Sequence, residues 1–430
     1  MYPLAPKVKA NLSELITQLV NGNEKWITDK AIGIGNKSNY WILNYIQGKE
    51  SVEHTDYASL ARGVVIRKTK EVPADPLSLI VSLPFIRFFN QSEPTAAKIE
   101  MTRSDMTEKL DGTMVGVFYD KELSNNPQWQ TRKMVSSDPQ DTAMVLTSFQ
   151  GGQFAFMPLI GSYVNKLNLA PEDKDNTLVF EFIHEASKVF TNYAPAEYGL
   201  YLIGGRRMSD LSEYSEVELD AIAKRIGAFR GQHFSVVDPS KPGLVSTAVE
   251  EAFKSMKDQR ENFEGFVFRD RLTGSRVKLK DPEYVQKHAL LGCLSLKNLL
   301  PMVLNEELEE IQAYFPIAKE MGAKITSKID NFVSTNSTLI AEWRAKNLSG
   351  KELAQALKNS PYSSYTVGLL FQHAKKDRTQ DVATADIPNE LKELIKTTAL
   401  GKDKKQPQIR AVVEMLDLRE QESTTPSIDL

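Results

Sequence analysis

The stretch Lys109-Leu110-Asp111-Gly112-Thr113-Met114-Val115-Gly116-Val117-Phe118-Tyr119 places a charged turn directly before an apolar run. The run from Thr113 onward is typical of a buried or half-buried β-strand. The turn before it combines a lysine and an aspartate with a glycine, which permits a tight backbone turn. The same tetrapeptide also suits an ordinary charged loop, so its meaning depends on the segments that accompany it.

Short β-type runs recur between turn signals up to about residue 285. These runs are Val64–Ile66, Leu79–Val81, Met114–Phe118, Leu178–Phe182, Leu200–Ile203, Phe266–Phe268 and Val277–Leu279. Helical stretches lie between them, including Leu12–Val20 and Glu216–Ile226. Because strands and helices do not alternate regularly, the pattern predicts an α+β fold of antiparallel sheets flanked by helices.

The last third of the chain is predicted to be all-α. An apolar repeat at three-to-four spacing begins it: Leu299, Val303, Leu304, Leu308 and Ile311. Ser349 with Glu352 forms a capping-box pattern, and Asp386 before Pro388 indicates another helix start. We therefore expect a first domain over residues 1–285, a helical domain over 286–420 and a disordered tail over 421–430.

The composition is that of an ordinary globular protein, with 430 residues, 41% hydrophobic and 25% charged. A single cysteine, Cys293, excludes a disulfide framework and argues against a structural zinc site. The start of the chain has no signal-peptide pattern, and no apolar run could span a bilayer. We expect a cytoplasmic monomer. The net charge of −3 means that nucleic acid would have to be bound by local basic patches.

Three further polar segments follow the lysine turn. Glu181 lies inside an apolar strand run, where an unpaired carboxylate would be costly to bury. Glu264-Gly265 precedes another strand, and Lys278 and Lys280 project from one face of the next. Two lysines on one strand face usually form a solvated surface, but beside a nucleotide phosphate they would act on it.

This order of segments resembles the covalent nucleotidyltransferase superfamily, which includes DNA ligases, RNA ligases and mRNA capping enzymes. More narrowly, the chain resembles the RNA ligase family of T-even phages. The further segments that carry this resemblance are Trp41–Tyr45, Ala61–Val65, Arg87–Asn90 and Glu283–Val285. The resemblance implies an ATP-dependent RNA ligase of nucleotidyltransferase fold, which joins 5′-phosphate and 3′-hydroxyl ends through a lysine–AMP intermediate and an AMP-capped RNA end.

The resemblance implies that Lys109 is the nucleophile that takes AMP from ATP. A free lysine is almost wholly protonated at neutral pH and cannot attack. We expect Lys278, Lys280 and a bound Mg²⁺ or Mn²⁺ to lower the pKa of Lys109. The same cations would stabilise the charge on the phosphate oxygens, with Lys280 at the α-phosphate.

The resemblance gives the acidic residues separate roles. Glu181 would hold the ribose hydroxyls, while Asp111 and Glu264 would orient the reactants and contact the metal. Lys133 lies where the family has a further essential lysine, although the preceding segment is longer here. Glu309 is the candidate metal ligand of the helical part, and its alternative interpretation is an exposed helix face.

Upstream residues would complete the nucleotide site by resemblance. Arg62 and Arg87 would bind phosphates or the RNA end, and Tyr45 and Phe89 would line the nucleotide site. Arg87 departs from the family's lysine, and its planar guanidinium binds differently from a point charge.

The helical last third separates the alternatives. Capping guanylyltransferases and DNA ligases normally append an OB barrel, which would appear as several short β runs. A helical domain instead resembles that of the phage RNA ligases, where it helps to recognise a folded RNA. We expect nicked tRNA as substrate, a separate polynucleotide kinase/phosphatase upstream, and the host cytoplasm as location if the chain is phage-encoded. A catalytically silent RNA-binding protein is disfavoured by the presence of Lys109 and the lysine pair.

Overall fold

The protein is described by a computed structural model. It describes residues 2–46, 55–147, 153–187, 190–236, 245–291, 296–305, 308, 316–345, 349–358, 366–368, 370–371, 387–400, 412–413, 415–416 and 418. No helix within these ranges is both long and apolar enough to cross a membrane. Two basic runs of the sequence, 373–378 and 402–405, could supply phosphate contacts or form solvated loops. These runs and the predicted tail at 421–430 lie outside the described residues.

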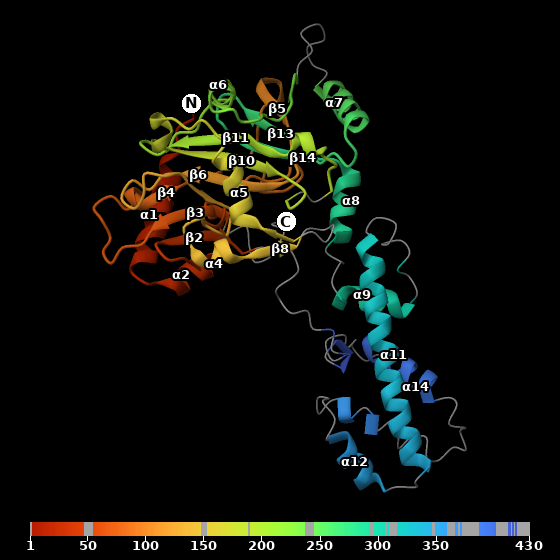
Figure 1. Ribbon diagram of the computed structural model, residues 1–430. Helices are drawn as coiled ribbons and strands as arrows, with labels where there is room; N and C mark the ends of the chain where they lie inside the picture. Colours follow the sequence, from red (N-terminus) through yellow and green to blue (C-terminus); the bar gives the residue numbers. More distant parts are fainter. Residues whose placement is uncertain are drawn as a thin grey trace. The chain divides into compact units, whose positions relative to one another are not determined.

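The described strands form three four-stranded sheets and one two-stranded sheet, all with antiparallel pairing (Figure 1). The first sheet has the order β1 (Ile32–Asn36), β2 (Tyr40–Tyr45), β3 (Arg62–Arg67), β4 (Ile80–Ser82). The second has the order β11 (Gly199–Arg207), β10 (Asn176–Ile183), β6 (Thr113–Phe118), β7 (Gln128–Gln130). The third has the order β12 (His233–Phe234), β5 (Ser104–Glu108), β13 (Gly265–Asp270), β14 (Arg276–Lys280). The small sheet pairs β8 (Val145–Thr147) with β9 (Gln153–Ala155).

Helices flank these sheets, as the sequence predicted. They are α1 (Pro6–Val20), α2 (Glu24–Asp29), α3 (Thr55–Ala58), α4 (Pro139–Ala143), α5 (Phe156–Val164), α6 (Glu216–Ile226) and α7 (Val245–Gln259). Helix α8 (Pro282–Leu291) follows the last strand in the sequence. Short 3-10 helices occupy Pro76–Leu79, Met101–Arg103, Pro171–Asp175 and Pro195–Glu197. The α+β prediction is therefore confirmed.

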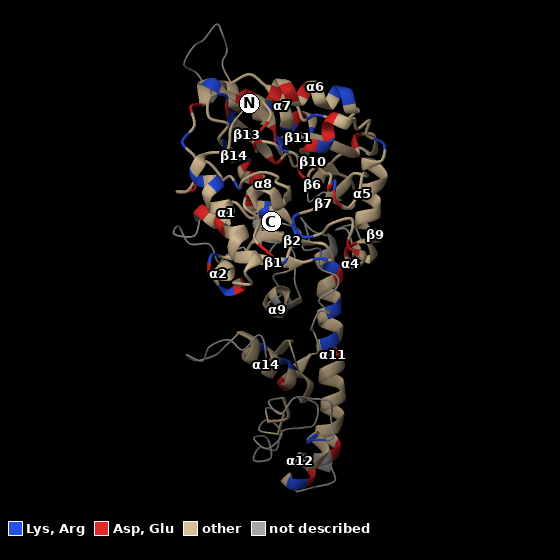
Figure 2. Cartoon of the chain, turned by 90° about the vertical axis from the view of Figure 1, so that its left-hand side faces the viewer, with Lys and Arg blue, Asp and Glu red and all other residues tan. Residues whose placement is uncertain are grey.

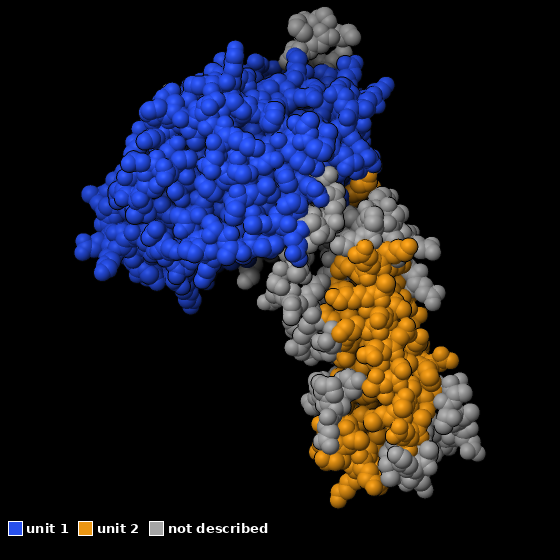
Figure 3. All heavy atoms as spheres, viewed as in Figure 1, with its two compact units in different colours: residues 1–285, 426–430 blue, residues 286–425 orange. Residues whose placement is uncertain are grey.

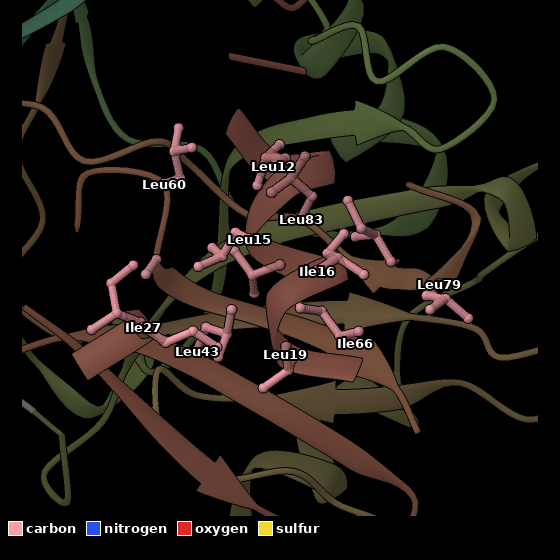
Figure 4. Packing of buried hydrophobic residues seen from close by; sticks show 14 of the residues in the cluster. Leu12, Leu15, Ile16, Leu19, Ile27, Leu43, Leu60, Ile66, Leu79 and Leu83 are labelled. Atoms are coloured by element: carbon pink, nitrogen blue, oxygen red, sulfur yellow. The ribbon is translucent and has the colours of Figure 1, made fainter. Parts of the chain in front are cut away.

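The first sheet is covered on both faces. The buried face of α1 has the spacing of an amphipathic helix: Leu12, Leu15, Ile16 and Leu19. It packs on Leu43 of β2 and Ile66 of β3 (Figure 4). The alternate side chains of the same strands, Ile42 and Val65, pack with Phe118 of β6 in the second sheet. The first sheet thus lies between α1 and the second sheet.

Alternation in the second sheet determines where Glu181 points. In β10, Phe180 and Phe182 belong to the core cluster that includes α5 and α6, whereas Val179 packs with Met114 on the other face. Because successive side chains on a strand point to opposite faces, Glu181 shares the face of Val179. This face is turned toward the first sheet.

The third sheet brings three chain segments to one end. Phe266 and Phe268 of β13 pack with Met256 of α7. In the antiparallel pairing, Phe266 is opposite Glu108 of β5 on one side and Leu279 of β14 on the other. The end of β5, the start of β13 and the end of β14 therefore lie together.

The chain divides into two compact units, residues 1–285 and 286–425 (Figure 3). The described elements of the second unit are all helices: α9 (Leu296–Asn305), α11 (Pro316–Ala345), α12 (Gly350–Lys358) and α14 (Ile387–Leu400). The expected cap of α12 is confirmed, because the Ser349 amide donates to Oε2 of Glu352 at 2.7 Å. α9 ends at Asn305, so that Leu308 of the predicted repeat lies beyond it. Acidic and basic residues are interspersed over both units (Figure 2).

Candidate active site

An ion-paired trio forms the centre of the candidate site. Nζ of Lys109 lies 2.7 Å from Oε2 of Glu264, and Nζ of Lys280 lies 3.0 Å from Oε1 of the same carboxylate. The Glu264 side chain is buried, while those of Lys109 and Lys280 are 21% and 22% exposed. One buried carboxylate thus holds the lysine of the charged turn and one lysine of the strand pair.

Two glycines permit this geometry. Gly265 has φ +140°, and a Cβ there would lie 2.2 Å from the carbonyl oxygen of Leu279. A Cβ on Gly112 would lie 2.4 Å from the carbonyl oxygen of Phe182. The Gly112 amide also donates to Oε1 of Glu181 at 3.2 Å. Both glycines of the motifs are therefore required by close backbone approach, and at Gly265 also by backbone conformation.

The Asp111 carboxylate is held by the chain itself. Its Oδ2 accepts hydrogen bonds from the amides of Phe190 and Thr191, each at 2.8 Å. It also forms a hydrogen bond with the Tyr284 side chain, and the Asp111 amide donates to the Tyr193 hydroxyl at 2.8 Å. The side chain of Asp111 is buried, so these contacts fix the turn that carries Lys109.

Neighbouring carboxylates dominate the electrostatics of Lys109 in the protein alone. Burial lowers its pKa, but the carboxylates of Glu264, Glu181 and Asp111 outweigh burial and raise the pKa above the ordinary value of 10.5. The lowering that we expect from Lys278, Lys280 and a bound Mg²⁺ or Mn²⁺ together stays a prediction, because the raised pKa is that of the protein alone, in which three carboxylates act on the ammonium. For Glu264, burial acts to raise the pKa, but the two paired lysines outweigh burial, and the pKa of Glu264 is lowered.

Two other groups are close to their titration points at neutral pH. Burial, reinforced by Glu264, raises the pKa of Glu181 to about 7 against the opposing effects of Lys109 and Arg62. Burial lowers the pKa of Lys278 to about 7, and the neighbouring cations act in the same direction. A bound polyanion would favour the charged form of Lys278 and oppose this shift.

Phe88 contacts two of the predicted cations. The guanidinium carbon of Arg62 lies 5.7 Å from the centroid of the Phe88 ring, and Nζ of Lys278 lies 5.4 Å from it. The Lys278 amide also donates to the Phe89 carbonyl at 3.0 Å. The segment that begins at Arg87 thus runs along the lysine-bearing strand β14.

Tyr45 lies among two guanidinium groups. Those of Arg87 and Arg132 are 4.2 and 4.9 Å from the centroid of its ring, and Nη1 of Arg132 lies 2.5 Å from its hydroxyl. Arg87 also lies over Phe89, at 4.9 Å from the ring centroid. Tyr45, Arg87 and Phe89, all predicted from the sequence, therefore form one cluster with Arg132.

Sequence reasoning missed Arg132 and Tyr193. The role expected of Lys133 stays a prediction; its side chain is exposed, whereas its neighbour Arg132 is buried against Tyr45. In the sequence, only the basic pair Arg132-Lys133 marks this position. The structure shows that the first member of the pair is the buried one. No local signal marks Tyr193, because it meets Asp111 across 82 residues of sequence. Glu309 lies outside the described residues.

The arrangement can bind and activate a phosphate group. Lysine and arginine side chains surround a partly exposed lysine amine, and the carboxylates near it can align that amine or a ribose hydroxyl. Among the described residues no group of three or more His, Cys, Asp or Glu side chains could hold a metal ion. A metal held mainly by phosphate oxygens and water, with one or two carboxylates, is compatible with this donor set.

Comparison with known proteins gives one family match. A family model described as RNA ligase matches residues 60–284, which is more than half of the 430 residues and includes the trio and Glu181. The comparison with curated proteins gives no match.

Solved structures that resemble the chain include an archaeal ATP-dependent RNA ligase, form 2, at 13% identity and a TM-score of 0.43, covering 90% of this chain and 82% of that one. A putative ATP-dependent DNA ligase from Aquifex aeolicus has 12% identity, a TM-score of 0.38 and coverage of 71% of each chain. A Naegleria gruberi RNA ligase with PPi has 14% identity, a TM-score of 0.30 and coverage of 52% of this chain and 65% of that one.

Proposed function

Because this chain belongs to the RNA ligase family, whose model matches residues 60–284, we propose that it attaches AMP from ATP to Lys109 and uses that AMP to join RNA ends. The enzyme would be an AMP-forming RNA ligase. The observation that carries the proposal is the trio of Lys109, Glu264 and Lys280, in which a single carboxylate holds the partly exposed amine beside a second cation.

The first step is the attack of the Lys109 amine on the α-phosphorus of ATP. Since Glu264 and its neighbours raise the pKa of Lys109, the ammonium must first lose one proton to solvent. The nitrogen–phosphorus bond then forms as the bond to the pyrophosphate oxygen breaks, pyrophosphate leaves, and the nitrogen loses a second proton to solvent. We therefore expect the rate of lysine–AMP formation to increase with pH above neutrality.

The surrounding residues would hold the nucleotide. Glu181 would accept hydrogen bonds from the ribose hydroxyls, and in its ionised form both of its oxygens are acceptors. Lys278 and Lys280 would neutralise the phosphates, and Arg62 would reach the same charges from the first sheet. Because Lys278 has a pKa of about 7 before any anion is bound, phosphate binding would shift it toward its charged form.

The cluster around Tyr45 would receive the outer phosphates or the RNA end. Arg87 and Arg132 offer planar guanidinium groups, which pair with phosphate oxygens through two parallel hydrogen bonds. Arg132 is therefore added to Lys133 as a candidate for the further essential basic residue that the resemblance implies.

The remaining steps pass AMP from Lys109 to the 5′-phosphate of RNA, and then let a 3′-hydroxyl displace AMP to form the phosphodiester. Mg²⁺ or Mn²⁺ would supply charge neutralisation on the phosphates. Asp111 already accepts hydrogen bonds from backbone amides, and Glu264 is already paired with two lysines. Either carboxylate would therefore add only one ligand to an ion held mainly by phosphate and water.

RNA is the substrate class that family membership gives. Nicked tRNA, a polynucleotide kinase/phosphatase that prepares its ends, a monomeric enzyme and a cytoplasmic location remain our proposals. The observation that supports a folded RNA as substrate is the second unit, because every element described there is a helix.

The test is transfer of label from α-labelled ATP to the protein in the presence of Mg²⁺. The unaltered protein should acquire acid-stable label, and Lys109→Ala should lose it entirely. Lys121→Ala is a matched control, because Lys121 pairs with Asp175 on the surface of the same unit and should leave labelling unchanged.

Other outcomes would redirect the assignment. Label from GTP in place of ATP would indicate a capping guanylyltransferase. No label from either nucleotide, in protein freed of bound AMP, would refute the proposed chemistry and favour a silent RNA-binding protein. Label that persists in Lys109→Ala would place the nucleophile elsewhere.

A further inference from the structure

The segment 190–193 holds the turn that carries Lys109 from two directions. The Tyr193 hydroxyl accepts a hydrogen bond from the Asp111 amide at 2.8 Å. In the opposite sense, the Asp111 carboxylate accepts from the amides of Phe190 and Thr191. Three residues of one segment, Phe190, Thr191 and Tyr193, and one aspartate therefore form a reciprocal contact, in which each side both donates and accepts.

The same segment also holds the turn that precedes Glu264. The Thr191 hydroxyl donates to the carbonyl of Asn262 at 2.8 Å, and the Asn262 amide group donates to the carbonyl of Phe190 at 3.3 Å. The Asn192 amide donates to the carbonyl of Glu261 at 3.3 Å. The turns next to Lys109 and Glu264, the partners of the 2.7 Å ion pair, thus both form hydrogen bonds with the segment 190–193. This segment belongs to neither of the strands that carry the two residues.

Tyr193 is held by contacts of its ring with an ion-paired arginine. Its side chain is buried, and the guanidinium of Arg260 lies 4.5 Å from its ring centroid. Arg260 forms ion pairs with Glu197 at 2.8 Å and with Glu108 at 3.4 Å. Because Glu108 directly precedes Lys109, Arg260 supports both the tyrosine ring and the strand end that leads into the turn.

From these contacts we infer that Tyr193 is a positioning residue for the lysine nucleophile. Its hydroxyl orients the backbone of the Lys109–Gly112 turn and so sets where the Lys109 amine meets the α-phosphorus. The inference rests on the proposed function. It assigns Tyr193 no contact with ATP, so the residue should matter for the rate of attack and little for nucleotide binding.

The substitution Tyr193→Phe removes the hydroxyl and keeps the ring beside Arg260. Tyr201→Phe is the matched control, because Tyr201 belongs to the same buried cluster with Leu110 and Tyr193, and its hydroxyl donates instead to the carbonyl of Glu197 at 3.0 Å. Both variants lose one buried hydroxyl contact, but only Tyr193→Phe releases the amide of Asp111.

The experiment measures single-turnover formation of lysine–AMP over a range of ATP concentrations, and separately the sealing of RNA that already carries a 5′-AMP cap. Tyr193→Phe should reduce the maximal rate of lysine–AMP formation about tenfold. The ATP concentration at half-maximal rate should change less than about twofold, and sealing of capped RNA should stay near the rate of the unaltered protein. Tyr201→Phe should match the unaltered protein in all three quantities.

The possible results separate the two proposals. If the unaltered protein forms no lysine–AMP, the proposed function fails. If the unaltered protein is labelled and Tyr193→Phe is labelled at the same rate, the positioning role is refuted. A parallel loss of labelling and of sealing in Tyr193→Phe, accompanied by a lower melting temperature than that of Tyr201→Phe, would reduce Tyr193 to a general support of the fold and would also overturn the inference.

Discussion

At the scale of single residues, the candidate site contains two ionisable groups whose charged forms are disfavoured by burial. Glu181 titrates near pH 7 in the folded protein, where burial and Glu264 raise its pKa. Lys278 titrates near pH 7 as well, where burial and neighbouring cations lower its pKa. Charged groups held in this way cost stability and are expected where a ligand later compensates for them.

Glu181→Gln should therefore make the protein more stable at neutral pH. The folded pKa of about 7 lies above the ordinary value of 4.5, so the folded state binds this proton more tightly and stability declines as pH rises from about 4.5 to about 7. Glutamine removes that decline, and its carbonyl oxygen can still accept from the Gly112 amide. The melting temperature of the variant should exceed that of the unaltered protein by a few degrees at pH 8 and match it near pH 4.5.

The exposed residue Glu71 supplies the control for this measurement. Glu71→Gln should change the melting temperature little at either pH. A melting temperature of Glu181→Gln that lies below that of the unaltered protein at pH 8 would contradict the assigned electrostatics of Glu181.

Residues of the site differed in how well the sequence predicted them. Glu181, Glu264 and Lys280 were predicted because each lies beside an apolar strand run that marks its position. The raised pKa of Lys109 could not be predicted, because it depends on the summed effect of three carboxylates brought together by pairing between distant strands. Arg132 could not be added as a candidate without knowing which side chain of the basic pair points inward.

At the scale of elements, the strand β13 and its first residue decide the geometry of the trio. Gly265 combines a φ of +140° with a backbone approach that leaves no room for a Cβ. Gly265→Ala should destabilise the fold by about 2–4 kcal/mol and abolish lysine–AMP formation, because strain and the clash with Leu279 would separate β13 from β14. Chemical denaturation and the labelling assay would measure the two effects.

Gly22→Ala tests whether strain alone explains that loss. Gly22 has φ +73° and no atom within 4 Å of the position of a Cβ, so this variant should lose about 1–2 kcal/mol and keep its labelling rate. If Gly22→Ala and Gly265→Ala reduced the labelling rate equally, the close approach of the Leu279 carbonyl to Gly265 would not explain the loss of activity.

The strands β6, β10 and β13 were predicted, and β5, the strand before the nucleophile, was not. β6, β10 and β13 each contain an apolar run that alternates or continues across the strand. β5 has the sequence Ser-Asp-Met-Thr-Glu, in which only Met106 is apolar. Its strand conformation comes from pairing with β13 and β12, which is a long-range property. Helices α1 and α6 were predicted because their apolar spacing is local.

At the scale of the whole molecule, every described residue of the candidate site lies in residues 1–285. A fragment of these residues should form lysine–AMP at a rate similar to that of the full chain, because the second unit supplies none of the described site residues. It should lose any preference for a folded, nicked RNA over an unstructured RNA of equal length. Labelling and competition between the two RNAs would measure these properties.

The fragment bearing Lys109→Ala is the control, and it should take up no label. A fragment that folds, as judged by circular dichroism, but takes up no label would show that the helical unit contributes to the first chemical step. Retention of the RNA preference by the fragment would locate recognition in the first unit.

The pairing of β3 limits how small a working piece of this protein can be. The family match begins at residue 60, yet β3 pairs with β2, which precedes the match, and α1 covers Val64 and Ile66 of β3. A chain started at residue 60 would present β3 as an open edge with unpaired N–H and C=O groups and an uncovered apolar face. Such an edge recruits strands from other copies and leads to aggregation. The residues matched by the family model are thus fewer than the residues needed for cooperative folding.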